Sequence, residues 1–130
     1  MIPYNARELL AHELRPGEVN YLSFELMLNQ YGIISQITTV LTVATTGASG
    51  LYVSDAYSIE FIHVDHSYSK IIANCFFSKD REILEASPKL ALEDLITINR
   101  NVHMIQQEEI EEAVLFYEDR HEEQKKSFHL

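Results

Sequence analysis

The segment Ile37–Thr45, which reads Ile-Thr-Thr-Val-Leu-Thr-Val-Ala-Thr, limits the fold of this chain more than any other. It is rich in β-branched residues, which favour strands, and it is apolar on both of the faces that a strand presents. A strand of this kind has to be covered on both sides. The segment therefore predicts a central strand in a sheet that other elements cover on both faces.

The stretch before this strand, Tyr21–Gln36, predicts a helix with its own start and stop signals. Ser23 is placed to cap the N-terminus, and Glu25 in the first turn suits the positive end of the helix dipole. Gly32 stands where a left-handed C-terminal stop is expected. One apolar face is formed at helical spacing by Phe24, Met27, Leu28 and Tyr31. We expect this face to pack on the strand at Val40–Val43.

Further helical and strand patterns follow along the chain. They are a helix over Asn5–Leu14 capped by Asn5, strands over Leu51–Val53, Tyr57–Val64 and Ile71–Phe77, a turn at 67–69, a short edge strand or helical turn over Glu82–Ala86, a helix that begins at Ser87-Pro88, and a last helix from Gln106 to about Gln124. The helix from Ser87 is expected to break at residues 99–101, although residues 96–104 also allow a strand.

Together these patterns predict one α+β domain over residues 1–130, a natural length for a single domain. We expect a small mixed or antiparallel sheet of about four or five strands, flanked by about four helices. Its core is expected at about residues 5–124, with a frayed tail at 125–130.

The net charge of −10 and the pI near 4.9 argue against direct binding of a nucleic-acid backbone, which needs clustered Lys and Arg. The N-terminus lacks the pattern of a signal peptide, and the longest apolar run is far shorter than the roughly 20 residues of a membrane span. Cys75 is the only cysteine, so neither a disulfide within the chain nor a cysteine metal site is expected. These features predict a cytoplasmic protein that does not bind membranes.

Few residues are candidates for catalysis or for metal or cofactor binding. His63 and Asp65 share one face of a predicted strand while His66 points away, and two ligands do not make a catalytic zinc site. Cys75 lies in an apolar run and is expected to be buried and inert. The loop 46–50 has two glycines but matches no phosphate-binding spacing. We therefore predict no enzyme, metal or cofactor, and a small metal-dependent enzyme that uses His63 and Asp65 stays open as an alternative.

Three segments, taken in order, resemble the C-terminal domain of the AbiEi family of antitoxins from type IV toxin–antitoxin systems. The first contains Tyr-Leu-Ser-Phe-Glu at 21–25 and Gln-Tyr-Gly-Ile-Ile at 30–34. The second is the Thr-rich strand 39–46 with the later strand 57–63, and the third is Ala-Ser-Pro-Lys-Leu-Ala-Leu-Glu-Asp-Leu at 86–95. The resemblance covers roughly residues 14–96. It implies a sheet flanked by helices and a partner that is a nucleotidyltransferase-like toxin of the AbiEii type.

Two departures limit what the resemblance implies. The family's Glu-Lys after the proline is Lys89-Leu90 here, and the family's N-terminal winged helix-turn-helix is not in this sequence. A transcriptional regulator that acts through a separate DNA-binding module is therefore an alternative to the antitoxin. The strongly acidic last helix is either a solvated face or a docking surface for a basic partner. The candidate interaction and family-motif positions are Ser23, Glu25, Tyr31, Gly32, Thr45, His63, Ser87, Pro88, Lys89 and Asp94.

Overall fold

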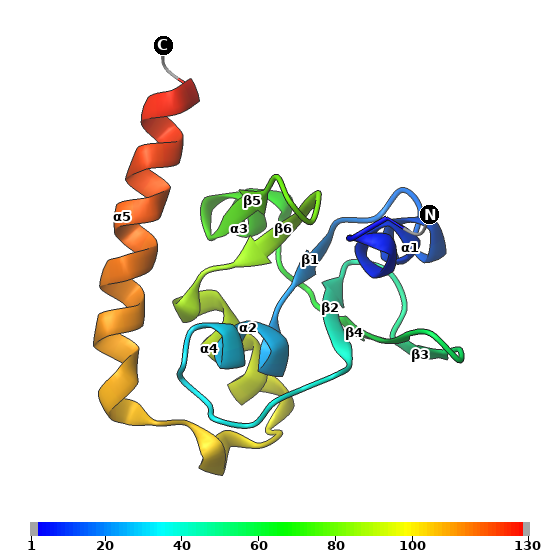
Figure 1. Ribbon diagram of the computed structural model, residues 1–130, viewed down its shortest axis with the longest axis horizontal. Coiled ribbons are helices and arrows are strands. Elements are labelled where there is room, and N and C mark those ends of the chain that lie inside the picture. The colour runs from blue at the N-terminus through cyan, green and yellow to red at the C-terminus, as the bar shows by residue number, and fades with distance from the viewer. Residues whose placement is uncertain (1–2, 129–130) are drawn as a thin grey trace.

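The computed structural model describes residues 3–128 and the side chains of residues 3–120. Its centre is a six-stranded mixed sheet in the order β3-β4-β2-β1-β6-β5 (Figure 1). The strands are β1 (Asn20–Leu22), β2 (Leu41–Thr45), β3 (Gly50–Val53), β4 (Ser58–His63), β5 (Cys75–Ser78) and β6 (Ile83–Ala86). The helices are α1 (Ala6–Leu14), α2 (Phe24–Gln30), α3 (Tyr68–Ala73), α4 (Pro88–Ile98) and α5 (Ile110–Phe128), with 3₁₀ turns η1 (Val102–Met104) and η2 (Gln107–Glu109). This is the predicted single α+β domain, with six strands in the described residues rather than four or five.

Strand β2 lies inside the sheet as predicted, antiparallel to β1 and parallel to β4, and all five of its residues are buried. Neighbouring residues of a strand point to opposite faces. In β1, Tyr21 points to α4, where its hydroxyl contacts Asp94. Leu22 is in register with Val43, and Val43 with Phe61, whose ring lies 4.0 Å from the guanidinium carbon of Arg15 at the end of α1. Helices α1 and α4 therefore cover opposite faces.

The predicted strand Ile37–Thr45 is too long by its first four residues. Ile37 is 84% exposed, and regular pairing begins at Leu41. The reason lies in the short partner strands, because β1 is in register with β2 only from Val43 to Thr45 and β4 only from Leu41 to Thr45. β-branched residues outside a ladder gain no pairing, so propensity alone does not extend the strand.

The predicted helix Tyr21–Gln36 begins as strand β1 and becomes helical only at Phe24. Ser23 stands at the N-cap position, but its hydroxyl donates to Asp94 and makes no capping hydrogen bond, so the predicted cap is wrong. Tyr21 and Leu22 pair with both β2 and β6, and this pairing overrides the helical spacing. The chain turns sharply at Phe24, whose φ is 62°. The helix then ends as expected, with Gly32 in the left-handed region at φ 76° and the buried pair Ile33-Ile34 leading out.

Two further segments differ from the sequence prediction. The predicted turn at 67–69 and strand Ile71–Phe77 are instead helix α3, capped by the Ser67 hydroxyl, followed by the shorter strand β5. The segment Glu82–Ala86 forms strand β6, which is not at an edge, because β5 folds back through a tight turn and takes the outer position. An apolar run such as Ile71–Phe77 fits a buried helix as well as a strand.

The C-terminal part follows the sequence more closely. Helix α4 starts at Pro88, and the Ser87 hydroxyl accepts the amide of Leu90 at 3.1 Å. It stops at Asn99, which has φ 52°, so the helical prediction for residues 96–98 holds and the strand alternative is wrong. Helix α5 continues to Phe128, past the predicted end at residue 124, and residues 129–130 of the predicted frayed tail lie outside the described chain. No helix within residues 3–128 has the length and apolar character of a membrane span.

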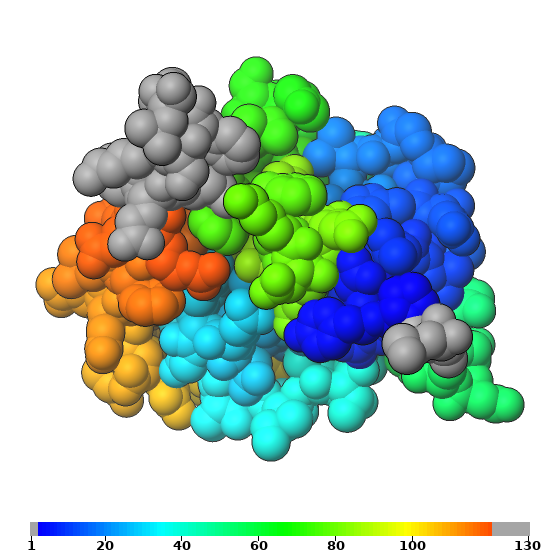
Figure 2. Space-filling model, turned by 45° about the horizontal axis from the view of Figure 1, so that its top comes forward, coloured from blue at the N-terminus to red at the C-terminus, as the bar shows by residue number. Residues whose placement is uncertain are grey.

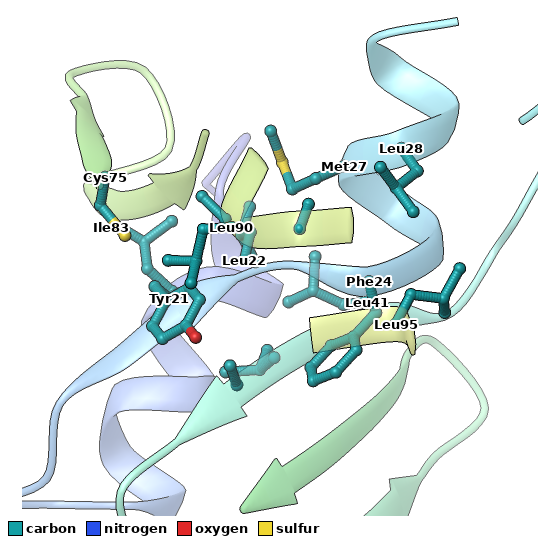
Figure 3. Packing of buried hydrophobic residues seen from close by; sticks show 14 of the residues in the cluster. Tyr21, Leu22, Phe24, Met27, Leu28, Leu41, Cys75, Ile83, Leu90 and Leu95 are labelled. Carbon is teal, nitrogen blue, oxygen red and sulfur yellow. The ribbon is translucent and has the colours of Figure 1, made fainter. Parts of the chain in front are cut away.

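Much of the core lies between the sheet and helices α2 and α4 (Figure 3), and Ala11 of α1 and Ile71 of α3 also belong to it. Phe24, Met27 and Leu28 of α2 are fully buried, and the helix packs on β2 and α4, as its apolar face predicts. Figure 3 shows Phe24 beside Leu41 and Leu95, where helix, strand and second helix meet. Tyr31, the fourth residue of that face, is half-buried. Cys75 is buried as predicted, and burial raises the pKa of its thiol.

Replacing Gly32 by alanine is expected to lower the free energy of unfolding by about 1 kcal/mol. A Cβ at this position meets no atom within 4 Å, so the whole loss comes from the left-handed backbone. Urea unfolding of Gly32→Ala measures it, with Ser35→Ala, an exposed residue nearby, as the control. Gly32→Asn should lower the free energy of unfolding by less than Gly32→Ala, because asparagine tolerates the left-handed conformation better than alanine. Equal stabilities for Gly32→Ala and wild type would contradict the backbone assignment.

Candidate functional site

The Asp94 carboxylate is the centre of a buried polar cluster. Its Oδ2 accepts hydrogen bonds from the Tyr21 and Ser23 hydroxyls, both at 2.7 Å, and its Oδ1 lies 2.8 Å from Nε2 of His66. The Asp94 side chain is 1% exposed and that of His66 is 17% exposed. We call these four residues the Asp94 cluster. A buried carboxylate is tolerated when donors surround it, and here three donors do so.

The sequence builds this cluster from three separate segments. Tyr21 and Ser23 are two positions apart on extended backbone, so their side chains point the same way. The cap at Ser87 sets the start of α4 and thereby the direction in which Asp94 points. His66 comes from the loop between β4 and α3. Burial, followed by the charge of Asp94, raises the pKa of the Tyr21 hydroxyl, which therefore stays a proton donor at neutral pH.

The cluster contains a serine, a histidine and an aspartate, but not in the arrangement of a nucleophilic triad. In a triad the serine donates to the histidine, and the aspartate orients that histidine. Here Ser23 donates to Asp94 itself and is fully buried. The sharp strand-to-helix turn also resembles the turn that exposes a nucleophile in hydrolases, but the residue with positive φ is the buried Phe24. The arrangement joins β1, α4 and the loop before α3.

A second cluster surrounds Arg100, just after α4. Its Nε and Nη2 donate to the two carboxylate oxygens of Glu25 at 2.6 and 2.7 Å, and its Nη1 donates to Glu60 at 2.8 Å. Asn101 donates to Glu25 as well, at 3.1 Å. A bidentate pair of this kind is the strongest form of an arginine–carboxylate contact. We call Glu25, Glu60, Arg100 and Asn101 the Arg100 cluster; they line a polar cavity of about 190 Å³ beside β2.

Glu25 serves this cluster rather than the helix dipole alone. Burial by itself would raise the pKa of its carboxyl, but the hydrogen bonds from Arg100 and the positive charge of that guanidinium outweigh burial and hold the pKa below its usual range. Hydrogen bonding to Glu25 in turn raises the pKa of Arg100. The left-handed backbone of Asn99 and Asn101 turns the chain on both sides of Arg100 toward α2 and β4.

Replacing Glu25 by glutamine is expected to lower the free energy of unfolding by about 1–2 kcal/mol at pH 7, the loss of a charge-assisted bond to a partly exposed arginine. Because the pKa of Glu25 is lower in the folded chain than in the unfolded one, its ionised form adds stability above the unfolded pKa of about 4.3. That stability is lost as the pH falls through the folded pKa. Urea unfolding at pH 7 and pH 3 should therefore show a difference that shrinks in acid, whereas exposed Glu13→Gln should show little at either pH. An equal loss at both values would be evidence against the ion pair.

The other candidate positions are dispersed. The Tyr31 hydroxyl donates to the Ala86 carbonyl at 2.6 Å, and the Thr45 hydroxyl donates to Asn20 at 2.6 Å. Ser87 is a cap, Pro88 is the first residue of α4 and is buried, and Lys89 is exposed. Among the ten predicted positions, the structure joins Ser23 and Asp94 by a hydrogen bond between side chains, and it places Thr45 in register with His63 on the neighbouring strands β2 and β4. Gly32 is a backbone position at the end of α2, and Glu25 belongs to the Arg100 cluster.

His63 is the last residue of β4, and both of its ring nitrogens have hydrogen-bond partners. Its Nδ1 lies 2.7 Å from the Gly47 carbonyl and its Nε2 lies 2.8 Å from Asp65. The Gly47 carbonyl and then Asp65 raise the pKa of its exposed imidazole. His66 contacts Asp94 from the loop after β4, and because β4 ends at His63 the strand alternation expected for these residues does not apply. Within the described residues, no three His, Cys, Asp or Glu side chains are placed together to hold a metal ion.

Five residues of the two clusters were not among the sequence candidates: Tyr21, Glu60, His66, Arg100 and Asn101. Tyr21 has a local signal, because it precedes Ser23 by two residues in an extended stretch. His66 and Arg100 have none, because their contacts lie 28 and 75 residues away along the chain. Only the fold brings them to their partners.

Comparison with known proteins adds no relative. No family model matches this chain, and neither the curated proteins nor the solved structures contain a match. The resemblance to the AbiEi family therefore stays a prediction from the sequence.

Proposed function

We propose that this chain is an AbiEi-like antitoxin of the cytoplasm, which counteracts a nucleotidyltransferase-like toxin of the AbiEii type by acting as a protein-interaction or regulatory module. One observation supports it above the others. Ser23 and Asp94 come from the first and third segments of the resemblance and meet in one buried cluster, with hydroxyl and carboxylate 2.7 Å apart. If the similarity of the segments were due to chance, there would be no reason for their matching residues to contact each other. Residues of a genuine family motif are expected to belong to one structural unit, as these two do.

The charge of the chain favours a protein partner. A net charge of −10 repels a phosphate backbone and attracts a basic protein surface. Enzymes that handle nucleotides and RNA carry basic surfaces for their substrates. An acidic module is electrostatically complementary to such a surface, which speeds association and selects the partner.

The test is co-expression with an AbiEii-type toxin whose induction stops growth. The wild-type chain should restore growth, and the same chain with Leu28→Asp, which is expected to unfold the domain, should not. A chain of unchanged abundance that fails to restore growth would overturn the antitoxin proposal. Matched protein amounts, followed by immunoblotting, separate loss of function from loss of protein.

A further inference from the structure

Strand β3 is one of the two outer strands of the sheet, and within the described chain only β4 pairs with it, antiparallel. Figure 1 shows it at the outer end of the sheet, on the side of the molecule away from α5. In an antiparallel pair, backbone groups face the neighbouring strand and face away from it at alternate residues. The Ser54 amide donates to the Tyr57 carbonyl at 2.8 Å, which sets this alternation. The backbone groups of Leu51 and Val53 therefore face away from β4.

The side chains of this edge are apolar and exposed. Leu51 and Val53 point to the same face of the sheet and are 67% and 65% exposed, whereas Tyr52 points to the other face and is half-buried. In Figure 2 the green atoms of this part of the chain protrude at the lower right, below the blue atoms of α1. Soluble proteins commonly protect an outer strand with Lys, Pro or a bulge, and β3 has none of these. The edge is thus a template for pairing with a further strand.

The sequence that leads to β3 carries no charge. Between Glu25 and Asp55 there is no Asp, Glu, Lys, Arg or His, although the whole chain has a net charge of −10. Two copies of an acidic chain repel each other over much of their surface. At β3 they can meet without opposing like charges. The outer strand at the other end, β5, differs because the charged turn Lys79-Asp80-Arg81 follows it directly.

We propose that β3 pairs with β3 of a second copy of this chain, in an antiparallel two-fold arrangement centred on Tyr52. This register sets Leu51 opposite Val53 of the second copy, so the outward-facing backbone groups of both residues form the hydrogen-bonded pairs. Tyr52 meets its own copy at the non-hydrogen-bonded pair, where side chains come closest. The two six-stranded sheets then form one continuous sheet across the dimer.

The same register gives a favourable arrangement of the nearest charges. Asp55 is three positions from the centre, so its two copies lie about 20 Å apart along the strands, beyond the Debye length of about 8 Å. Arg15 donates to the Ala48 carbonyl at 2.7 Å, at the end of the edge that Asp55 of the second copy reaches. Glu18, which accepts from the Thr46 hydroxyl, lies farther from the centre. The approach of Asp55 to Arg15 at both ends favours a second copy as the occupant.

Sedimentation velocity of the full chain, from about 5 to about 500 μM, tests for a dimer that is expected to be weak because the interface is small. The wild type should show a reversible monomer–dimer equilibrium. Leu51→Asp brings a desolvated carboxylate from each copy to the interface and should raise the Kd of the dimer about tenfold or more. Val53→Pro removes an outward N–H without changing the charge and should do the same. The matched control is Leu115→Asp on α5, a leucine 56% exposed, which should dimerise like the wild type.

Disulfide cross-linking tests the register. Tyr52→Cys should give a covalent dimer on mild oxidation, because the Cα atoms of a non-hydrogen-bonded pair lie about 4.5 Å apart, within the range of a disulfide. Leu51→Cys should cross-link far less, since its own copy is a diagonal neighbour at about 7–8 Å. Native Cys75 is buried and can stay in place.

Several results would overturn this inference. A monomer at every concentration would exclude self-pairing and leave the edge to a strand of another protein. A dimer that Leu51→Asp and Val53→Pro leave intact, or that Leu115→Asp dissociates, would place the interface elsewhere. Cross-linking through Leu51→Cys rather than Tyr52→Cys would contradict the two-fold centre. Urea unfolding checks that each variant keeps the cooperative transition of the wild type, so that a lost dimer is not a lost fold.

Discussion

Replacing Leu28 by aspartate is expected to unfold the domain. Leu28 is fully buried in α2 between β2 and α4. Truncation of a buried leucine alone costs about 2–5 kcal/mol, and a desolvated, unpaired carboxylate adds several more. The sum is comparable to the whole stability of a domain, about 5–15 kcal/mol. Far-ultraviolet circular dichroism and the loss of a cooperative urea transition should report this.

The matched control for this variant is Leu115→Asp on α5. Leu115 is 56% exposed, so the same substitution meets water there and should leave the transition almost unchanged. A Leu28→Asp protein that keeps a cooperative transition but no longer restores growth would show that this face of α2 binds a partner. The assignment of Phe24, Met27 and Leu28 to the core would then be wrong.

Replacing Asp94 by alanine is expected to lower the free energy of unfolding by about 3–5 kcal/mol. The carboxylate is the shared acceptor of Tyr21, Ser23 and His66, and the first two hydroxyls are fully buried. Removing it leaves these donors without that acceptor and opens a small cavity. Asp94→Asn keeps the shape and one acceptor oxygen, so its loss should be smaller. Urea unfolding at pH 7 compares the two.

Glu93 provides the control for Asp94, because it is its neighbour on α4 and carries the same charge. Its side chain is 47% exposed and pairs with Lys70 on the surface. Glu93→Ala should lose no more than about 1 kcal/mol, the usual range of an exposed pair. A similar loss in Glu93→Ala and Asp94→Ala would mean that the Asp94 cluster contributes no more than a surface contact.

The elements with strong local signals could be predicted from the sequence. Ser87-Pro88 begins α4 because the cap and the proline act within one turn, and Gly32 ends α2 because the left-handed backbone favours glycine. Strand β4 shows the alternation of a half-buried strand, with Ile59 and Phe61 buried. In each of these cases the physical cause lies within a few residues of the element that it specifies.

The sequence predictions are wrong where contacts between residues far apart in the chain determine the local structure. Strand β1 has only three residues, and the neighbours that make it a strand, β2 and β6, lie far along the chain. The apolar run that contains Ile71 forms a helix because Ser67 caps it and Ile71 alone faces the core, while Ile72 is 43% exposed. For the site, Ser23 and Asp94 could be proposed as positions but not as partners. Their contact depends on the register of β1 and the start of α4 together.

Nucleotidyl transfer by a purified AbiEii-type toxin, measured with increasing amounts of the purified chain, tests the proposed function most directly. The folded chain should reduce the transfer rate as it approaches the toxin concentration, and Leu28→Asp at the same concentrations should leave the rate unchanged. The wild-type chain has to show a cooperative urea transition in the same buffer. An undiminished transfer rate in a large excess of this folded chain would contradict the proposal that the protein counteracts its toxin by direct interaction.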